Sequence, residues 1–286
     1  MNSQVKLIEC PRDAMQGLKE FVPTEKKIHY INQILRCGFD TVDFGSFVSP
    51  KAIPQMADTE EVLAGLDLAS TSSKLLAIVA NVRGAEDACK HAVISYLGFP
   101  FSISETFQQR NTNSGIAESL ERVKEIQNLC IKHNKELVVY ISMAFGNPYG
   151  DVWNSDIAID WCRKLNEEVG VKILALSDTI GISAPDNIDY LFRSLIPALP
   201  KVEFGAHLHT TPGTWKEKID AAWKAGCRRF DGAIKGYGGC PMAKDELTGN
   251  MPMENLLSYF KEIGMNSGIN EEAFSSAYSG SSEIFH

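Results

Sequence analysis

Several features that mark membrane, secreted and nucleic-acid-binding proteins are missing from this sequence. None of its apolar runs approaches the ~20 residues that a membrane-spanning helix needs, and no signal-peptide pattern precedes the first strand-like run. An excess of positive charge is missing too: the formal net charge of -8 argues against non-specific binding to nucleic acid or to an anionic membrane. The seven cysteines, an odd number without a CxxC pair, favour reduced thiols and a cytoplasmic protein.

What is present is an alternation of strand and helix along a chain of 286 residues. Apolar, strand-like runs occur at residues 5–9, 41–44, 75–79, 92–96, 136–142, 171–177, 202–207 and 229–232. Helical patterns follow them at residues 24–37, 59–66, 84–90, 114–134, 155–169, 186–199, 214–225 and 253–263. No linker, low-complexity stretch or internal repeat interrupts the series.

This uninterrupted series predicts an α/β fold, a single (β/α)8 TIM barrel over residues 1–264. An open, doubly wound sheet is the alternative. We expect residues 265–286 to form a short C-terminal capping segment, with a helix and a loose terminus. In a barrel the strand-to-helix loops open on one face, so polar residues directly after the strands are candidates for a functional site.

Two histidines, His207 and His209, stand at the end of the strand-like run 202–207. Alternate side chains of a strand point to the same face, so the two imidazoles would project together and supply half of a metal site. Such a pair also occurs at a polar strand edge or as a hydrogen-bonded pair in a core. The choice between these readings depends on oxygen ligands from other strand ends.

Polar side chains, several of them with oxygen atoms, do follow the other predicted strands. Besides the histidines, the strand ends and the loops after them carry Arg12, Asp13, Gln16, Asp43, Ser46, Asp178, Cys240 and Asn250. A carboxylate, two imidazoles and an amide oxygen make an octahedral site for Mg2+ or Mn2+ once water or substrate fills the rest. Zinc is less expected, because it usually takes fewer ligands, often with a thiolate.

Several motifs resemble those of one enzyme family. They are residues 46–51 (Ser-Phe-Val-Ser-Pro-Lys), 54–56 (Pro-Gln-Met), 178–181 (Asp-Thr-Ile-Gly), the pair His207-x-His209 and residues 238–241 (Gly-Gly-Cys-Pro). In order, and over nearly the whole chain, the sequence is similar to the 3-hydroxy-3-methylglutaryl-CoA lyases, of the metal-dependent lyase and Claisen-condensing barrel superfamily. The resemblance implies that a divalent cation is held by Asp13, His207, His209 and Asn250. It also implies that Arg12 steadies the developing enolate and that Cys240 lies on a mobile loop that closes over the substrate.

The sequence departs from the family pattern at four places. The loop after the first strand is one residue short and reads Cys10-Pro11. Asp43 stands where the lyases carry glutamate, Asn147 replaces a cysteine, and residues 210–212 (Thr-Thr-Pro) replace an Asp-Thr-Tyr run. These departures bear on the identity of the substrate more than on the type of reaction.

Retro-aldol cleavage of a 3-hydroxy thioester needs a base for the hydroxyl proton, a positive group for the enolate and an acid to protonate it. The candidate base is Asp43, His207 or a relay through either, and Arg12 suits the enolate or thioester oxygen. Cys240 is either that acid or a small residue in a glycine-rich turn. Asp178 either orients a metal ligand or caps a turn. The residues expected to bind substrate are Gln16, Ser46, Asn81 and Asp178.

Three functions are open at this point. The first is a divalent-metal-dependent lyase of a 3-hydroxy acyl-CoA, with 3-hydroxy-3-methylglutaryl-CoA cleaved to acetyl-CoA and acetoacetate as the leading case. The second is a synthase that condenses an acyl-CoA with an α-keto acid; residues 46–50 and the lack of sequence for a large C-terminal domain argue against it. The third is a barrel that binds metal and ligand without catalysis. We expect an acyl-CoA substrate, a homodimer, and no nucleic-acid or membrane partner.

Overall fold

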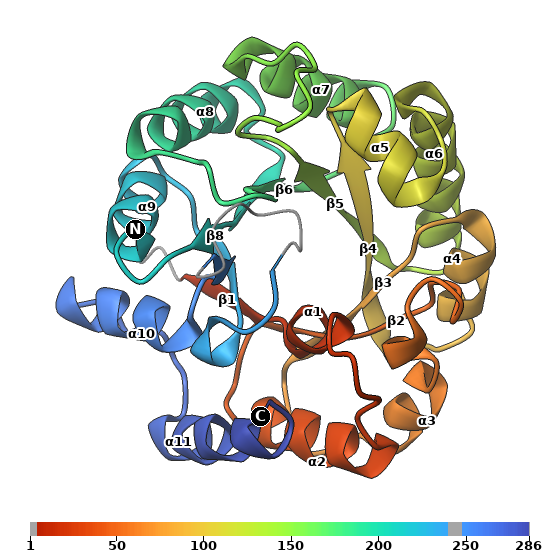
Figure 1. The fold of residues 1–286 in the computed structure, drawn as a ribbon, viewed down its shortest axis with the longest axis vertical. Coiled ribbons are helices and arrows are strands. Elements are labelled where there is room, and N and C mark those ends of the chain that lie inside the picture. The colour runs from red at the N-terminus through yellow and green to blue at the C-terminus, as the bar shows by residue number, and fades with distance from the viewer. Residues whose placement is uncertain (1–4, 240–247, 286) are drawn as a thin grey trace.

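The computed structural model describes residues 5–239 and 248–285, and its parallel strands close into a barrel (Figure 1). Around the barrel the strand order is β1-β2-β3-β4-β5-β6-β7-β9. The strands are β1 (Lys6–Glu9), β2 (Thr41–Ser46), β3 (Lys74–Ile78), β4 (Ile94–Ser102), β5 (Glu136–Ser142), β6 (Ile173–Ser177), β7 (Glu203–His207) and β9 (Arg229–Gly232). Because β1 pairs with both β2 and β9, the sheet is closed and the open doubly wound alternative is wrong. The predicted (β/α)8 TIM barrel is confirmed.

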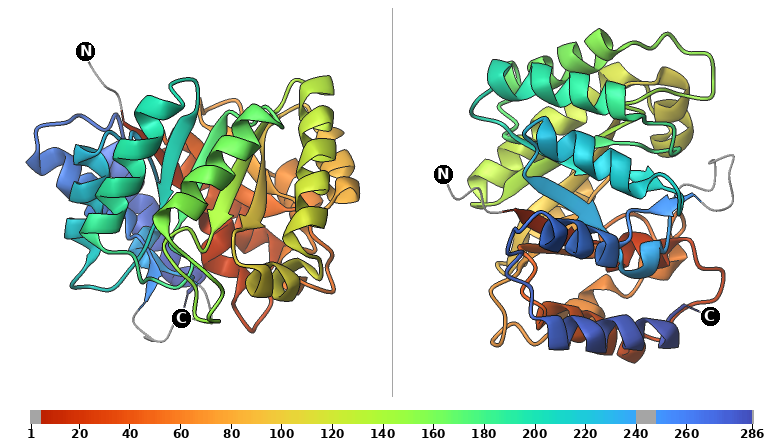
Figure 2. Two further views of the ribbon diagram at one scale, coloured as in Figure 1. Left: turned by 90° about the horizontal axis from the view of Figure 1, so that it is seen from above. Right: turned by 90° about the vertical axis from the view of Figure 1, so that its left-hand side faces the viewer.

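Helices surround the barrel and connect successive strands (Figure 2). The α-helices are α1 (Pro11–Gln16), α2 (Thr24–Leu35), α3 (Thr59–Ala64), α4 (Val82–Cys89), α5 (Glu105–Thr112), α6 (Ile116–Lys132), α7 (Ser155–Glu167), α8 (Pro185–Ala198), α9 (Trp215–Lys224), α10 (Met253–Glu262) and α11 (Glu271–Gly280). Short 3-10 turns are η1 (Pro54–Met56), η2 (Ile234–Gly236) and η3 (Ser281–Glu283). Within residues 5–239 and 248–285, no helix is both long and apolar enough to cross a membrane.

Local sequence signals explain where two helices begin and which side of a third faces the strands. Asn81 and Asn154 cap α4 and α7, since each side-chain oxygen accepts a hydrogen bond at 2.9 Å from the backbone N–H three residues on. In α6, the residues Leu120, Val123 and Ile126 are buried at helical spacing. This apolar stripe lets α6 pack against β4 and β5.

Strand residues alternate between the barrel interior and the layer beneath the helices. In β5, Val138 and Tyr140 belong to the cluster that fills the interior, whereas Leu137, Val139 and Ile141 belong to the larger core outside it. Because side chains fill the interior, a reaction site has room only at the mouth of the barrel, where the strands end.

The structure corrects two predictions in the first half of the chain. The residues after β1, predicted as a loop, form α1, and β4 continues through Pro100 to Ser102 although the pattern predicts an end at residue 96. Proline usually interrupts a strand because it lacks an N–H, yet β4 stays paired with β5 up to Ser102. The sequence does not predict α5, because this polar helix buries only Phe107 and Gln108 and offers almost no apolar stripe.

A loose terminus was predicted for the C-terminal segment, and this prediction is wrong for the described residues up to 285. The helix α11 packs against α2 (Figure 1). After it, Ser281, Ile284 and Phe285 are buried. The apolar side chains near the chain end supply this docking, which a short pattern rich in serine and glycine does not reveal. The division into a catalytic barrel over 1–264 and a capping segment over 265–286 stays a prediction.

Candidate active site

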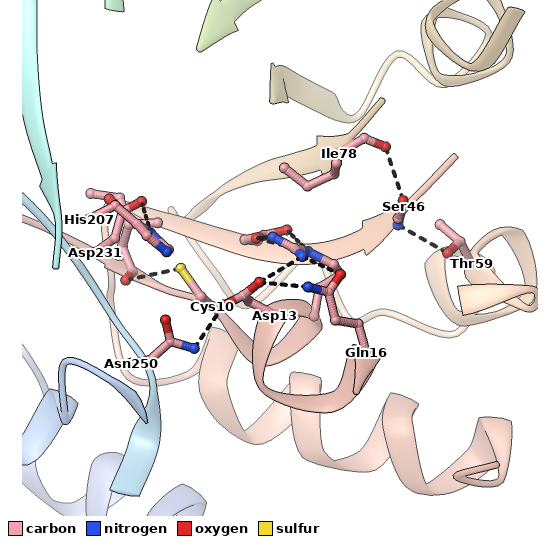
Figure 3. A network of polar contacts seen from close by, with 12 residues as sticks. Cys10, Asp13, Gln16, Ser46, Thr59, Ile78, His207, Asp231 and Asn250 are labelled. Carbon is pink, nitrogen blue, oxygen red and sulfur yellow. Dashed lines mark hydrogen bonds and ion pairs between the residues drawn. The ribbon is translucent and has the colours of Figure 1, made fainter. Parts of the chain in front are cut away.

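The helix α1 brings three polar side chains to the mouth of the barrel directly after β1. Pro11 occupies its first turn, where the missing N–H leaves no helical hydrogen bond unmade. Arg12, Asp13 and Gln16 then lie within one helical turn of each other. The Arg12 Nη1 donates to Asp13 Oδ1 at 2.9 Å and to Gln16 Oε1 at 2.7 Å, and Gln16 Nε2 donates to the same Asp13 oxygen at 3.0 Å. The three side chains form one hydrogen-bonded group (Figure 3).

Asp43 of β2 completes this group by pairing with Arg12. Both Asp43 oxygens accept from Arg12, with Nη2 at 2.5 Å from Oδ2 and Nε at 3.2 Å from Oδ1. Burial raises the pKa of Asp43 to about 6, although the Arg12 charge acts to lower it. For Asp13, burial acts to raise the pKa, but Arg12, His207 and His209 together lower it to about 2. Asp13 is therefore an anion at neutral pH, whereas the pKa of Asp43 lies close to neutral pH.

The two histidines come from different strands, which corrects the expectation that they share one. β7 ends at His207, and His209 begins the short strand β8 (His209–Thr210), which pairs antiparallel with β10 (Gly249–Asn250). The imidazole rings are nevertheless adjacent, with centroids 5.5 Å apart. The pairing β8–β10 sets Asn250 opposite His209 in register. The pairing thereby places Asn250, which follows β9 in the chain, next to the end of β7.

A hydrogen bond orients each histidine ring. His207 Nδ1 lies 3.2 Å from Asp231 Oδ2, and His209 Nδ1 lies 3.1 Å from the Thr179 carbonyl oxygen. Burial and the neighbouring His207 lower the pKa of His209 to about 4, so this ring is neutral at pH 7. Burial acts to lower the pKa of His207, but the Asp231 carboxylate raises it overall. With Nδ1 engaged, each ring offers Nε2 to a ligand.

Asn250 connects the carboxylate of Asp13 to the loop after β9. Its amide nitrogen donates to Asp13 Oδ2 and to the Tyr237 carbonyl oxygen, both at 2.8 Å. The atom that Asn250 offers to a cation is therefore its amide oxygen. The structure thus brings together seven of the predicted site residues: Arg12, Asp13, Gln16, Asp43, His207, His209 and Asn250.

Three further predicted residues have other hydrogen-bond partners in the described part of the chain. Ser46 Oγ donates to the Ile78 carbonyl oxygen at 3.3 Å, and Asn81 caps α4. Asp178, 1% exposed, accepts from Lys218 Nζ at 2.8 Å and from Ser183 Oγ at 2.5 Å. The same Lys218 nitrogen donates to the His209 carbonyl oxygen at 2.9 Å. Cys240, the remaining predicted site residue, lies outside the described residues.

Sequence reasoning missed Asp231, Lys218 and Tyr140. Asp231 lies in the strand β9 and orients His207, and Lys218 lies in α9, where an amphipathic helix gives no hint of a buried amine. Tyr140 packs edge-on against His207 with centroids 5.5 Å apart, and its buried hydroxyl has no hydrogen-bond partner among the described residues. The alternation along β5, which turns residue 140 inward, was the one local signal for this tyrosine.

The sequence profile of the HMGL-like family matches residues 4–279. The chain belongs to the HMGL-like family. It is 33% identical over 270 residues to a hydroxymethylglutaryl-CoA lyase of Bacillus subtilis, which covers 93% of this chain and 88% of the relative. It is likewise 33% identical over 272 residues to a Pseudomonas aeruginosa 3-hydroxy-3-isohexenylglutaryl-CoA/hydroxymethylglutaryl-CoA lyase, over 94% of this chain and 89% of that protein.

Solved structures of the HMGL-like family superpose closely on this barrel. The HMG-CoA lyase of Bacillus subtilis matches with a TM-score of 0.92 at 32% identity, over 98% of this chain and 93% of that one. An HMG-CoA lyase of Acinetobacter baumannii, solved with coenzyme A and 3-methylmalate, matches with a TM-score of 0.90 at 28% identity, over 99% of this chain and 92% of that one.

The HMGL-like family implies a divalent metal ion, and the residues at this barrel mouth fit one. The ligand atoms of Asp13, His207 and His209 lie within 4.8 Å of one another, and His209 Nε2 is buried without a hydrogen-bond partner among the described residues. A buried nitrogen of this kind is costly unless something binds it. Cys10, His207 and Asp231 form a second close group, but burial raises the pKa of the Cys10 thiol well above its usual value, so that group would offer a protonated thiol in place of an anionic ligand. The first group is therefore the better cation site.

Proposed function

We propose that this protein is a divalent-metal-dependent lyase that cleaves 3-hydroxy-3-methylglutaryl-CoA into acetyl-CoA and acetoacetate. The observation that carries the proposal is the meeting of Asp13, His207, His209 and Asn250 beside the Arg12–Asp43 pair, at the mouth of an HMGL-like barrel. The names of the curated relatives support the substrate. The structure solved with coenzyme A supports an acyl-CoA partner.

The proposed metal ligands are Asp13, His207, His209 and Asn250. One carboxylate, two imidazoles and an amide oxygen favour Mg2+ or Mn2+ over softer metals. When bound, such an ion supplies Lewis-acid chemistry, lowering the pKa of the substrate hydroxyl and neutralising the substrate carboxylate. Asp231 and Thr179 fix the two rings, so little reorganisation is needed when the ion is bound.

Asp43 is the proposed base for the substrate hydroxyl. Its pKa of about 6 lets the carboxylate be free of a proton at neutral pH and still accept one. His207 is less suited, because a histidine that binds the metal through Nε2 has no free lone pair. Loss of the hydroxyl proton allows the bond between C2 and C3 to break, which releases acetoacetate and leaves the enolate of acetyl-CoA.

Arg12 is the proposed stabiliser of that enolate. Its side chain is 8% exposed, and Asp43 and Asp13 hold the guanidinium in a fixed orientation. Burial acts to lower its pKa, but these two carboxylates raise it, so Arg12 keeps its charge. A preorganised cation with several N–H donors suits an oxygen on which negative charge develops. Cys240 is retained as the proposed acid that protonates the enolate carbon.

The proposed substrate contacts differ in their support. Gln16 hydrogen-bonds Arg12 and Asp13 and lies next to the reacting groups. Ser46 and Asn81 are proposed only as residues of the surrounding wall, since their side chains serve a turn and a helix cap. For Asp178 we propose the orienting role that was one of the two expectations from the sequence, because its buried carboxylate holds Lys218, which in turn holds the backbone of His209.

The test is a product assay on metal-free protein. Protein treated with a chelator is incubated with 3-hydroxy-3-methylglutaryl-CoA, with and without Mg2+ or Mn2+, and acetyl-CoA and acetoacetate are quantified. We expect both products in equal amounts only when metal is added. Metal binding without product would favour the non-catalytic barrel, and product from an acyl-CoA plus an α-keto acid would favour the synthase. A homodimer and a cytoplasmic location stay predictions.

A further inference from the structure

The loop after β9, residues 236–239, lies against two of the proposed metal ligands, Asp13 and Asn250. Gly238 has φ +84°, and a Cβ on it would lie 2.8 Å from the Asp13 carbonyl oxygen and 2.9 Å from the Asn250 amide nitrogen. The amide of Asn250 in turn donates to Asp13 Oδ2 and to the Tyr237 carbonyl oxygen. The position of the loop backbone therefore decides where the Asn250 amide stands.

This loop has unusual backbone freedom and needs an anchor. Lys235, Gly236, Gly238 and Gly239 all have positive φ, at 59°, 66°, 84° and 123°. Glycine reaches such angles without strain, so the loop can also adopt other conformations at little cost. Between these residues only Tyr237 carries a large side chain that can fix the loop by packing.

Tyr237 is anchored by the C-terminal segment. Its ring stacks on Phe285 with centroids 4.1 Å apart and an angle of 16° between the planes. Phe285 is 6% exposed and packs edge-on against Tyr30 of α2 at 6.1 Å. Two residues before Tyr237, and just ahead of the loop, Lys235 Nζ lies 4.8 Å from the ring centroid of Tyr278 on α11. The segment that docks on α2 thus contacts both Tyr237 in the loop and Lys235 just before it.

We propose that Tyr237 and Phe285 are positioning residues for the metal site. Their stack holds the carbonyl oxygen of Tyr237 where it accepts from the Asn250 amide nitrogen, so the amide oxygen keeps its direction toward the cation. An Asn amide can rotate, and losing one of its two acceptors removes half of what fixes it. The inference rests on the proposed function, because it takes Asn250 as a metal ligand.

The test measures Mn2+ affinity by electron paramagnetic resonance of the free ion, alongside kcat and KM. Tyr237→Leu and Phe285→Leu remove the stack but keep an apolar side chain, and we expect each to weaken Mn2+ binding on the order of 10-fold. Tyr237→Phe keeps the ring and should bind Mn2+ as the wild type does. The matched control is Phe274→Leu, because Phe274 lies on α11 and packs against Phe39 at 6.4 Å and Tyr278 at 6.2 Å but takes no part in the stack of Tyr237 on Phe285. It should lower the melting temperature without changing Mn2+ affinity.

Each outcome supports or contradicts the positioning role of Tyr237 and Phe285. Circular dichroism identifies folded variants, and Phe285→Met is the milder substitution should either leucine variant not fold. Wild-type Mn2+ affinity in a folded variant without the stack would overturn the inference. So would an equal loss of affinity in Tyr237→Phe or Phe274→Leu, since the effect would then come from destabilisation in general. A wild-type protein that binds no Mn2+ would instead contradict the proposed function.

Discussion

The substitution Lys218→Met tests whether a buried ion pair holds His209 in place. Lys218 Nζ donates to Asp178 Oδ2 at 2.8 Å, to the Gly181 carbonyl oxygen at 3.1 Å and to the His209 carbonyl oxygen at 2.9 Å. The Lys218 and Asp178 side chains are 2% and 1% exposed. Methionine has a similar length but makes none of these bonds, and it leaves the carboxylate buried without a cation. Breaking a buried pair in this way lowers the free energy of unfolding by about 3–5 kcal/mol.

Two assays separate the stability effect from the effect on the site. Urea unfolding should show the loss of stability, and Mn2+ affinity should fall on the order of 10-fold because the backbone of His209 is no longer held. In the double variant Lys218→Met/Asp178→Asn the buried charge is gone, so part of the stability should return while the Mn2+ affinity stays low. Lys224→Met is the control: it lies on the same helix in an exposed pair with Asp220, so the change should be below about 1 kcal/mol.

Two results would contradict the role of the Lys218–Asp178 pair. A Lys218→Met protein that unfolds within about 1 kcal/mol of the wild type would show that the pair is not what stabilises this region. A double variant that regained Mn2+ affinity together with stability would show that the unpaired charge of Asp178, rather than the lost bond to His209, had weakened the site.

Further predictions address the reacting groups. Asp13→Ala and His209→Ala should abolish Mn2+ binding measured by calorimetry while circular dichroism stays unchanged; full activity after exhaustive chelation would contradict this. Arg12→Lys should lower kcat on the order of 10²-fold with little change in KM, and the reverse pattern would make Arg12 a binding residue. Because Asp43 must be unprotonated to act as a base, kcat/KM should fall as the pH drops below its pKa of about 6; a profile that is flat there would exclude it. Cys240→Ser should keep Mn2+ affinity but lose most turnover, since a hydroxyl is a weaker acid than a thiol, and undiminished turnover would remove the cysteine from the mechanism.

Local sequence patterns were enough to predict the order of strands and helices. Periods of two and of 3.6 residues report which side of an element is apolar, and they need only neighbours along the chain. The pattern located β5 at its observed bounds, Glu136–Ser142. It failed for α5, which is polar on most sides, and at Pro100, where pairing with β5 outweighs the local preference of proline. These errors occur where tertiary packing, rather than the periodicity of the sequence, determines the secondary structure.

The candidate site was predictable wherever its residues stand at strand ends. Asp13 and His207 follow from the rule that barrel strands end on one face, combined with residue types that bind cations, whereas Asp43, expected at a strand end, lies inside β2. That rule does not say which side chains bond to each other. The Arg12–Asp43 pair is one such contact, in which helix α1 and strand β2 meet.

The tertiary structure alone decided the groups that surround and orient these residues. His209 and Asn250 face each other because β8 pairs with β10, Asp231 reaches His207 from the neighbouring strand, and Phe285 reaches Tyr237 from beyond the barrel. Each contact joins residues far apart in the chain or in different elements. Such contacts depend on the closure of the barrel and the docking of α11 on α2, which bring the partners together, and no local periodicity of the sequence encodes them.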